Sequence, residues 1–178
     1  LAMKLVEINK NKFDVAIDLK YAGKDNIVGK KIFLENKCLL HPEAASMLLK
    51  ASEIAKSMGY KLKIFDAYRP KYVQQALWKF SPNSEFLSDP EKGSPHTRAI
   101  AVDLTLINFN NKEYDMGTSF DDFSKKAFHL SDQVSIKAKK NRSALLSIMT
   151  LAGFDFYHNE WWHYQLFNSK KYKLVNKI

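Results

Sequence analysis

Two histidines and two carboxylates in this sequence have the residue types of a metal-dependent hydrolytic site. His96 and Asp103 lie in the stretch SPHTRAIAVDLTL, and Glu160 and His163 occur together much later, in EWWH. Two imidazoles and one carboxylate can supply three ligands of a tetrahedral zinc ion, whose fourth position stays open for water at catalytic sites. Glu160 would then be placed to take a proton from that water as a general base.

The same residues also have simpler explanations. Asp103 could form an ion pair with Arg69 or Arg98 instead of binding a metal, and the spacing between His96 and Asp103 is by itself a weak metal motif. The three-residue spacing in EWWH would also place its two polar side chains on opposite faces of a regular strand. The pattern of residues alone therefore leaves both a metal site and a structural ion pair open.

Asp103 must be positioned by a strand, because the run from Ala99 onward is small, branched and apolar. Alternation along this strand predicts one apolar core face and one face of small residues around a carboxylate. The predicted core face holds Ile100, Val102, Leu104 and Leu106, and the other face holds Ala99, Ala101, Asp103 and Thr105. A carboxylate buried on such a face requires a cation, a hydrogen-bond network or a metal ion.

Three helices and several strands are expected around this segment. Helices are predicted over residues 41–59, 71–80 and 135–153, with Pro42 near the first start and Gly59 and Gly153 at two of the ends. Strands are predicted over residues 13–21, from residue 61 into a turn closed by Pro70, and within 154–167, and a polar loop over 81–95. This order favours a single α+β domain over residues 1–178, with a central, mostly antiparallel sheet packed by helices.

The composition is that of an ordinary globular protein: of 178 residues, 46% are hydrophobic and 26% are charged. The single cysteine, Cys38, excludes an internal disulfide framework. No apolar run approaches the roughly 18 residues of a membrane span. The net charge is +9, but the lysines are scattered, with small clusters at KAKKNR and KKYK. The first cluster opens an amphipathic helix and is explained by a solvated face, so nucleic acid is not an expected partner.

Three segments, in this order along the chain, resemble a known family. FDAYRP, SPHTRAIAVDLTL and NEWWHY look like the DGYRP, SxHxxGxAxD and ExWH elements of zinc D-alanyl-D-alanine dipeptidases, the VanX-like members of the D-Ala-D-Ala metallopeptidases. DLKYAGKDNIVGK, GTSFDDF and NRSALLSIMTLAGF resemble further segments of that family. The similarity extends from about residue 13 to residue 167, which is nearly the whole chain.

The resemblance implies a role for particular residues. His96, Asp103 and His163 would hold one zinc ion per chain in a cleft on the sheet, Glu160 would be the catalytic base, and Arg69 would stabilise the oxyanion. An ion pair of Arg69 with Asp66 or Asp103 is the structural alternative for that side chain. The residues that fall where the family lines its substrate pocket are Tyr21, Ser94, Asp121 and Trp162.

The sequence also departs from the family pattern. The glycine of SxHxxGxAxD is Ala99 here and that of DGYRP is Ala67, and each adds only a methyl group, which we expect a strand to tolerate. Pro95 directly precedes the first proposed ligand and stiffens the chain there. The loop over residues 81–93 is shorter than in the dipeptidases, which bears on how strictly substrate length is limited.

The expected activity is therefore zinc-dependent hydrolysis of D-alanyl-D-alanine or a closely related short peptide derived from the bacterial cell wall. One alternative is a D,D- or L,D-carboxypeptidase that trims longer peptidoglycan stem peptides. Another is a non-catalytic, zinc-containing binding module, as in the hedgehog signalling domain, although such a module would need neither Glu160 nor Arg69. The N-terminal LAMKLVEINK lacks the apolar core of a signal peptide, so we expect the bacterial cytoplasm, or the periplasm or secretion if a signal peptide has been removed.

Overall fold

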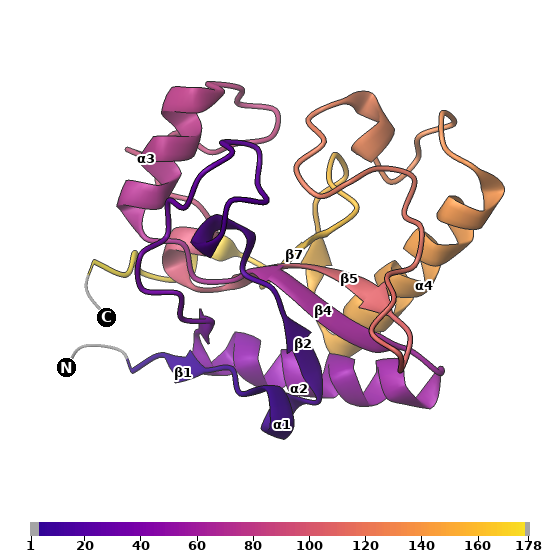
Figure 1. Ribbon diagram of the computed structural model, residues 1–178. Coiled ribbons are helices and arrows are strands. Elements are labelled where there is room, and N and C mark those ends of the chain that lie inside the picture. Colours follow the sequence, from indigo (N-terminus) through magenta and orange to yellow (C-terminus); the bar gives the residue numbers. More distant parts are fainter. Residues whose placement is uncertain (1–3, 177–178) are drawn as a thin grey trace.

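The computed structural model describes residues 4–176, in which five strands form the central sheet of an α+β fold (Figure 1). Neighbouring strands are antiparallel except for the first pair, which is parallel. The prediction of a mostly antiparallel sheet is therefore confirmed. Across the sheet the order is β2 (Val15–Ile17), β4 (Lys61–Asp66), β5 (Ala101–Ile107), β7 (His163–Gln165) and β6 (Asp155–Phe156), and a separate pair joins β1 (Val6–Glu7) to β3 (Leu39–Leu40).

Two long helices cover one face of the sheet. Helix α2 (Pro42–Ser57) contacts β4, helix α4 (Ile136–Ala152) contacts β5, and the two helices also pack against each other. Helix α3 (Lys71–Phe80) lies on the opposite side of the sheet from α2 (Figure 1). The short helices are α1 (Lys10–Phe13) and the 3-10 turns η1 (Lys20–Ala22), η2 (His96–Arg98), η3 (Lys125–Ala127) and η4 (Ser169–Lys171). Within residues 4–176, no helix is long and apolar enough to cross a bilayer.

The three long helices begin and end close to the predicted residues, and side-chain caps are present at two of their starts. The ring nitrogen Nδ1 of His41 accepts a hydrogen bond from the backbone N–H of Glu43 at the start of α2. The hydroxyl of Ser135 accepts one from the N–H of Ala138 at the start of α4, and Gly153 ends that helix with φ +110°.

Two predicted strands are much shorter in the structure. Of residues 13–21 only Val15–Ile17 form a strand, because Phe13 ends α1 and Tyr21 belongs to η1. The aromatic segment 154–167 forms the two short strands β6 and β7, and residues 158–162 between them make a turn.

Neither Ala99 nor Ala67 lies in a strand, so the reason for expecting their methyl groups to be tolerated was wrong. Residues His96–Arg98 form a 3-10 turn, Ala99 follows it with φ +57°, and β5 begins only at Ala101. This left-handed conformation costs a residue with a Cβ atom about 1–2 kcal/mol, whereas glycine adopts it freely. The glycine in the family pattern therefore suits the backbone here, and this chain accommodates alanine instead.

A β-bulge in β4 changes the direction of one carboxylate. Ile64 pairs with Leu104 of β5, yet Asp66 pairs with the adjacent residue, Asp103, so Phe65 is an additional residue on β4. Alternation without the bulge would direct Asp66 to the same face as Ile64, which is the face packed on α2 and α4. The bulge instead places Asp66 beside Asp103 on the other face.

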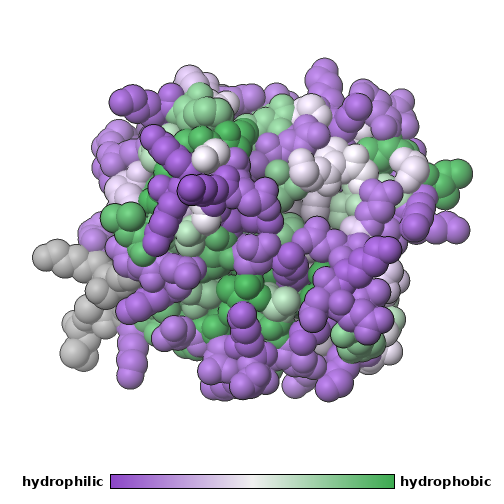
Figure 2. All heavy atoms as spheres, in the orientation of Figure 1, coloured by the Kyte–Doolittle hydropathy of each residue, from purple (hydrophilic) through white to green (hydrophobic). Residues whose placement is uncertain are grey.

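The basic cluster at the start of α4 contains one buried arginine. Lys137, Lys139 and Lys140 are exposed, as expected for a solvated face, and hydrophilic side chains dominate the view in Figure 2. Arg142, however, is 2% exposed, and its guanidinium donates to the carbonyls of Met116, Lys126 and Phe128 at 2.7, 2.9 and 2.8 Å. Arg142 therefore ties α4 to the segment over residues 116–128, which carries Asp121.

Residues 127–129 support the turn between β6 and β7. The N–H of Trp161 donates to the carbonyl of Ala127, and the N–H of His129 donates to the carbonyl of His158, at 3.1 and 3.0 Å. The ring of His129 packs edge-on against Phe156, and its Nε2 atom is buried without a hydrogen-bond partner among the described residues. Burial lowers the pKa of His129 to about 4, and the charge of nearby Arg142 adds to this effect.

The conformation of Ala99 predicts how substitutions there affect stability. Replacement by valine should lower the free energy of unfolding by on the order of 2 kcal/mol or more, because a buried β-branched residue must adopt φ > 0. Replacement by glycine should change it by less than about 1 kcal/mol. Urea unfolding of the metal-free proteins measures both, with Ala144→Val on α4 as a control costing about 0.5 kcal/mol. Equal effects at both alanines would contradict this account of Ala99.

The buried His129 predicts a loss of stability in mild acid. Below about pH 6.5 the unfolded chain binds a proton that the folded imidazole does not bind until about pH 4, so the free energy of unfolding falls as the pH decreases through this window. Between pH 7 and pH 4.5 the loss due to this group should be on the order of 2 kcal/mol. His129→Phe should lose correspondingly less than the parent protein. An unchanged pH dependence in His129→Phe would rule out this assignment.

Candidate metal centre

Three neighbouring strands bring acidic and imidazole side chains together on the face of the sheet opposite α2 and α4. The register pairs Asp66 of β4 with Asp103 of β5, and Asp103 with His163 of β7. His96 comes from the 3-10 turn η2, which directly precedes β5. All four side chains are buried, so the charge on each carboxylate must be balanced within the site.

The donor atoms of His96, Asp103 and His163 form a compact triangle. Nε2 of His96 lies 3.2 Å from Nδ1 of His163 and 3.2 Å from an Asp103 carboxylate oxygen, and Nδ1 of His163 lies 3.0 Å from the other Asp103 oxygen. A tetrahedral ion with bonds of about 2.0–2.1 Å requires donors about 3.3 Å apart. The separations are therefore close to those that such an ion needs, with a different Asp103 oxygen nearest each imidazole, and the three residues are compatible with a bound metal ion.

Hydrogen bonds on the outer side of each imidazole direct a lone pair into this triangle. The backbone carbonyl of Ala67 lies 2.8 Å from Nδ1 of His96, and the side-chain carbonyl of Gln165 lies 2.9 Å from Nε2 of His163. Because an oxygen of this kind only accepts, each outer nitrogen carries a hydrogen. The inner nitrogens are the atoms left to act as metal ligands once they carry no hydrogen, and a held outer N–H is typical of metal-binding histidines.

Charge and burial shift the pKa values of the groups in this cluster. Burial by itself would raise the pKa of Asp103, but the two adjacent imidazoles hold it well below its usual range. Burial would lower the pKa of His163, yet the Asp103 carboxylate raises it to about 9. Without a metal, a proton on His163 thus balances the charge of Asp103. Burial also raises the pKa of Asp66, although the charge of Arg69 opposes this.

Glu160 shares the site because the backbone before His163 is a turn and not a strand. The turn over residues 158–162 rotates the chain, so a carboxylate oxygen of Glu160 lies 3.8 Å from Nδ1 of His163. Glu160 and His163 would point to opposite faces of a regular strand, but the turn lets both side chains face the same site. Burial raises the pKa of Glu160 to about 8, with the charge of His163 opposing and the charges of Asp103 and Asp121 adding to the shift.

Arg69 is held by several acceptors at the edge of the cluster. Its Nε and Nη2 atoms both lie 2.8 Å from an Asp66 oxygen, Nη1 donates to Gln74 at 2.9 Å, and Nη2 lies 3.5 Å from Asp103. Both ion pairs of the structural alternative are thus present. A guanidinium has five N–H groups, and these contacts use at most four of them, so one N–H of Nη1 remains for a ligand in the cavity beside it.

A cavity of about 240 Å³ opens over the cluster. Ser94, Asp121 and Trp162 line it together with Arg69, His96, Asp103, Glu160 and His163. Tyr21 lies behind Asp121 and donates a hydrogen bond from its hydroxyl to that carboxylate at 2.7 Å. Burial raises the pKa of Asp121 to about 7. The lining residues that the sequence analysis did not identify are Gln74, residues 84–88, Pro95, Phe123, Tyr157 and Gln165.

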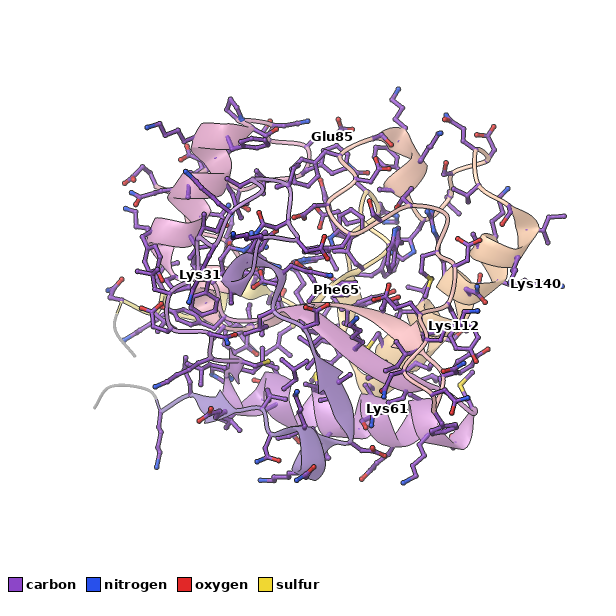
Figure 3. The ribbon with its side chains drawn as sticks, in the orientation of Figure 1. Lys31, Lys61, Phe65, Glu85, Lys112 and Lys140 are labelled. Carbon is purple, nitrogen blue, oxygen red and sulfur yellow. The ribbon has the colours of Figure 1, made fainter. Side chains whose placement is uncertain are left out.

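The loop over residues 81–95 closes one side of this cavity through contacts with distant segments. The ring of Phe86 stacks on Phe123 with centroids 5.0 Å apart, and the hydroxyl of Tyr157 donates to the carbonyl of Glu85 at 2.7 Å. Gln74 of α3 donates to the carbonyl of Ser88 at 2.7 Å. Glu85 lies at the far edge of the molecule from α2, well above Phe65 in the sheet (Figure 3). These contacts close the cavity on that side.

Comparison with known proteins gives one consistent result. The family model described as D-Ala-D-Ala dipeptidase matches residues 1–177. A D-alanyl-D-alanine dipeptidase of Escherichia coli (strain K12) is 40% identical over 162 residues, which is 91% of this chain and 84% of the relative. A D-alanyl-D-alanine dipeptidase of Enterococcus faecium is 35% identical over 170 residues, which is 84% of each chain.

Proposed function

This chain belongs to the D-Ala-D-Ala dipeptidase family, and on that premise we propose that it hydrolyses D-alanyl-D-alanine, or a closely related short cell-wall peptide, with one bound zinc ion. We take residues 1–178 as one metallopeptidase domain. The observation that carries the proposal is the convergence of two imidazole nitrogens and the Asp103 carboxylate beside a second buried carboxylate, Glu160, in one cavity. A purely structural metal site has no use for the second carboxylate.

His96, Asp103 and His163 are the proposed ligands, through Nε2, a carboxylate oxygen and Nδ1. Their two nitrogen donors and one oxygen donor match the ligand set of catalytic zinc, which uses three protein ligands and keeps a fourth position for water. When bound, zinc lowers the pKa of that water and polarises the scissile carbonyl group. Imidazole and carboxylate ligands also suit other divalent metals, so the ligand types alone do not select zinc.

Glu160 is the proposed general base. Its carboxylate takes a proton from the attacking water and then returns the proton to the nitrogen of the leaving D-alanine, so the peptide C–N bond breaks as the amine forms. A general base works best when its pKa lies near the operating pH. Burial raises the pKa of this carboxyl to about 8, and a cation held by the neighbouring residues would lower it again toward neutrality.

Arg69 is proposed to stabilise the negative charge that develops on the carbonyl oxygen. Asp66 and Gln74 fix the guanidinium before substrate binds, so little reorganisation is needed when the charge appears. The burial of the group strengthens this effect, because charges interact more strongly away from water.

The size of the cavity favours a short substrate. A volume of about 240 Å³ lies below the 300–1,000 Å³ that is usual for pockets of drug-sized ligands. A dipeptide is therefore a better match than a peptidoglycan stem, which would have to pass the loop over residues 81–95. The proposed substrate-binding residues are Ser94, Trp162, Asp121 and, through its hydrogen bond to Asp121, Tyr21.

Substitution of the proposed base and of one proposed ligand should have different effects. Glu160→Ala should keep one zinc ion per chain but lose activity on D-Ala-D-Ala by roughly 10²–10⁴-fold, because only proton transfer is removed. His163→Ala should lose tightly bound zinc and activity together. Elemental analysis and turnover measure the two properties, and exposed Glu53→Ala on α2 is the matched control. Near-normal turnover in Glu160→Ala would refute the base, and retained tight zinc in His163→Ala would refute the ligand.

A substrate panel tests the reaction itself. Free D-alanine is measured after incubation with D-Ala-D-Ala or with a pentapeptide that ends in D-Ala-D-Ala, before and after removal of metal by a chelator and again after addition of zinc. We expect cleavage of the dipeptide alone, lost on chelation and restored by zinc. Cleavage of the pentapeptide would indicate a carboxypeptidase instead. If the zinc-loaded protein cleaves neither peptide, this substrate class is wrong.

A further inference from the structure

We propose that Gln165 is a positioning residue for the metal centre, whose side-chain carbonyl holds His163 in the form that presents Nδ1 as a ligand. This inference rests on the proposed function, because it concerns how one of the proposed ligands is prepared for metal. Gln165 is a half-buried residue of the cavity wall.

The position of Gln165 follows from the regular part of β7. His163 and Gln165 are two residues apart in a strand, so both side chains lie on the same face of the sheet. Gln165 pairs with Ala101 of the neighbouring strand β5, just as His163 pairs with Asp103. The small Ala101 side chain leaves room for the longer amide, whose Oε1 lies 2.9 Å from Nε2 of His163.

Two acceptors compete for the hydrogen of neutral His163. The Asp103 carboxylate lies 3.0 Å from Nδ1 and favours a hydrogen on that atom, whereas the Gln165 carbonyl lies 2.9 Å from Nε2 and favours a hydrogen there. Only the second form leaves a lone pair on Nδ1 for a metal ion. Gln165 thus opposes a hydrogen bond to Asp103 that would otherwise stabilise the form unable to bind metal.

The two proposed histidine ligands differ in the kind of group that accepts their outer N–H. The acceptor for His96 is the backbone carbonyl of Ala67, and no substitution of a side chain removes that group. For His163 the acceptor is itself a side chain. Loss of an outer hydrogen bond of this kind lowers metal affinity by about 10–100-fold in known metal sites.

The test compares zinc affinities of Gln165 variants by competition with a chromophoric chelator. Gln165→Met keeps the length of the side chain but has no carbonyl, so its zinc dissociation constant should rise about 10–100-fold. Gln165→Glu restores an acceptor at the same distance and should bind zinc at least as tightly as the parent protein. Gln75→Met, on the exposed face of α3, is the matched control and should leave the affinity unchanged.

A spectroscopic measurement separates this role from a general structural effect. Long-range ¹H–¹⁵N spectra report which ring nitrogen of a neutral histidine carries the hydrogen. In the zinc-loaded parent protein and Gln165→Glu, the Nε2–H of His163 should show the nitrogen shift and slow exchange of a hydrogen-bonded N–H, and in Gln165→Met it should lose both. Thermal unfolding of the metal-free proteins should be similar for all of them.

The outcomes distinguish the inference from the proposed function. If the parent protein binds one zinc ion and Gln165→Met binds it with the same affinity, the positioning role is wrong and the proposed metal site stands. An equally large loss of affinity in Gln165→Glu and Gln165→Met would show that Gln165 acts by shape and would also overturn the inference. If the parent protein binds no zinc at these residues, the proposed function fails first.

Discussion

The buried carboxylate of Asp103 is the constraint on which the rest of the site depends. It lies in the middle of β5, where every residue is buried, so its negative charge needs positive partners close at hand. Protonated His163 and, at a longer distance, the Arg69 guanidinium provide them, and the His96 ring lies 3.2 Å from the same carboxylate. The same arrangement gives a cation two nitrogen donors and one oxygen donor, so the electrostatic requirement of the fold and the proposed chemistry are met by the same contacts.

Irregular backbone occurs where these partners are brought together. The bulge at Phe65 directs Asp66 toward Arg69, the left-handed conformation of Ala99 joins the turn of His96 to β5, and the turn before His163 directs Glu160 into the cavity. Each costs free energy relative to a regular element, and strain of this kind is typical of functional sites. The regular helices α2 and α4 supply the apolar packing that supports the opposite face of the sheet.

Much of this arrangement could be predicted from the sequence, because the signals were local. Helix signals such as Pro42 and Gly153 and the apolar alternation of β5 identified the main elements, and the motif residues pointed to His96, Asp103 and His163, which lie together in the structure and whose metal binding stays a prediction. The bulge at Phe65 and the conformation of Ala99 could not be predicted, since they depend on pairing between strands distant in sequence. The contacts that close the cavity, such as Phe86 with Phe123, also arise only in the tertiary structure. The position of Gln165 beside His163 could have been predicted, because residues two apart in a strand share a face.

The most direct test of the account is X-ray absorption at the zinc edge of protein loaded with one zinc ion per chain. The proposed ligands predict a shell of nitrogen and oxygen atoms at about 2.0–2.1 Å, with the outer-shell scattering of two imidazole rings. Loss of one imidazole contribution in His96→Ala would assign that ring to His96. A sulfur neighbour at about 2.3 Å, which only Cys38 or a methionine could supply, or a shell without imidazole scattering, would contradict the central claim that His96, Asp103 and His163 hold the metal.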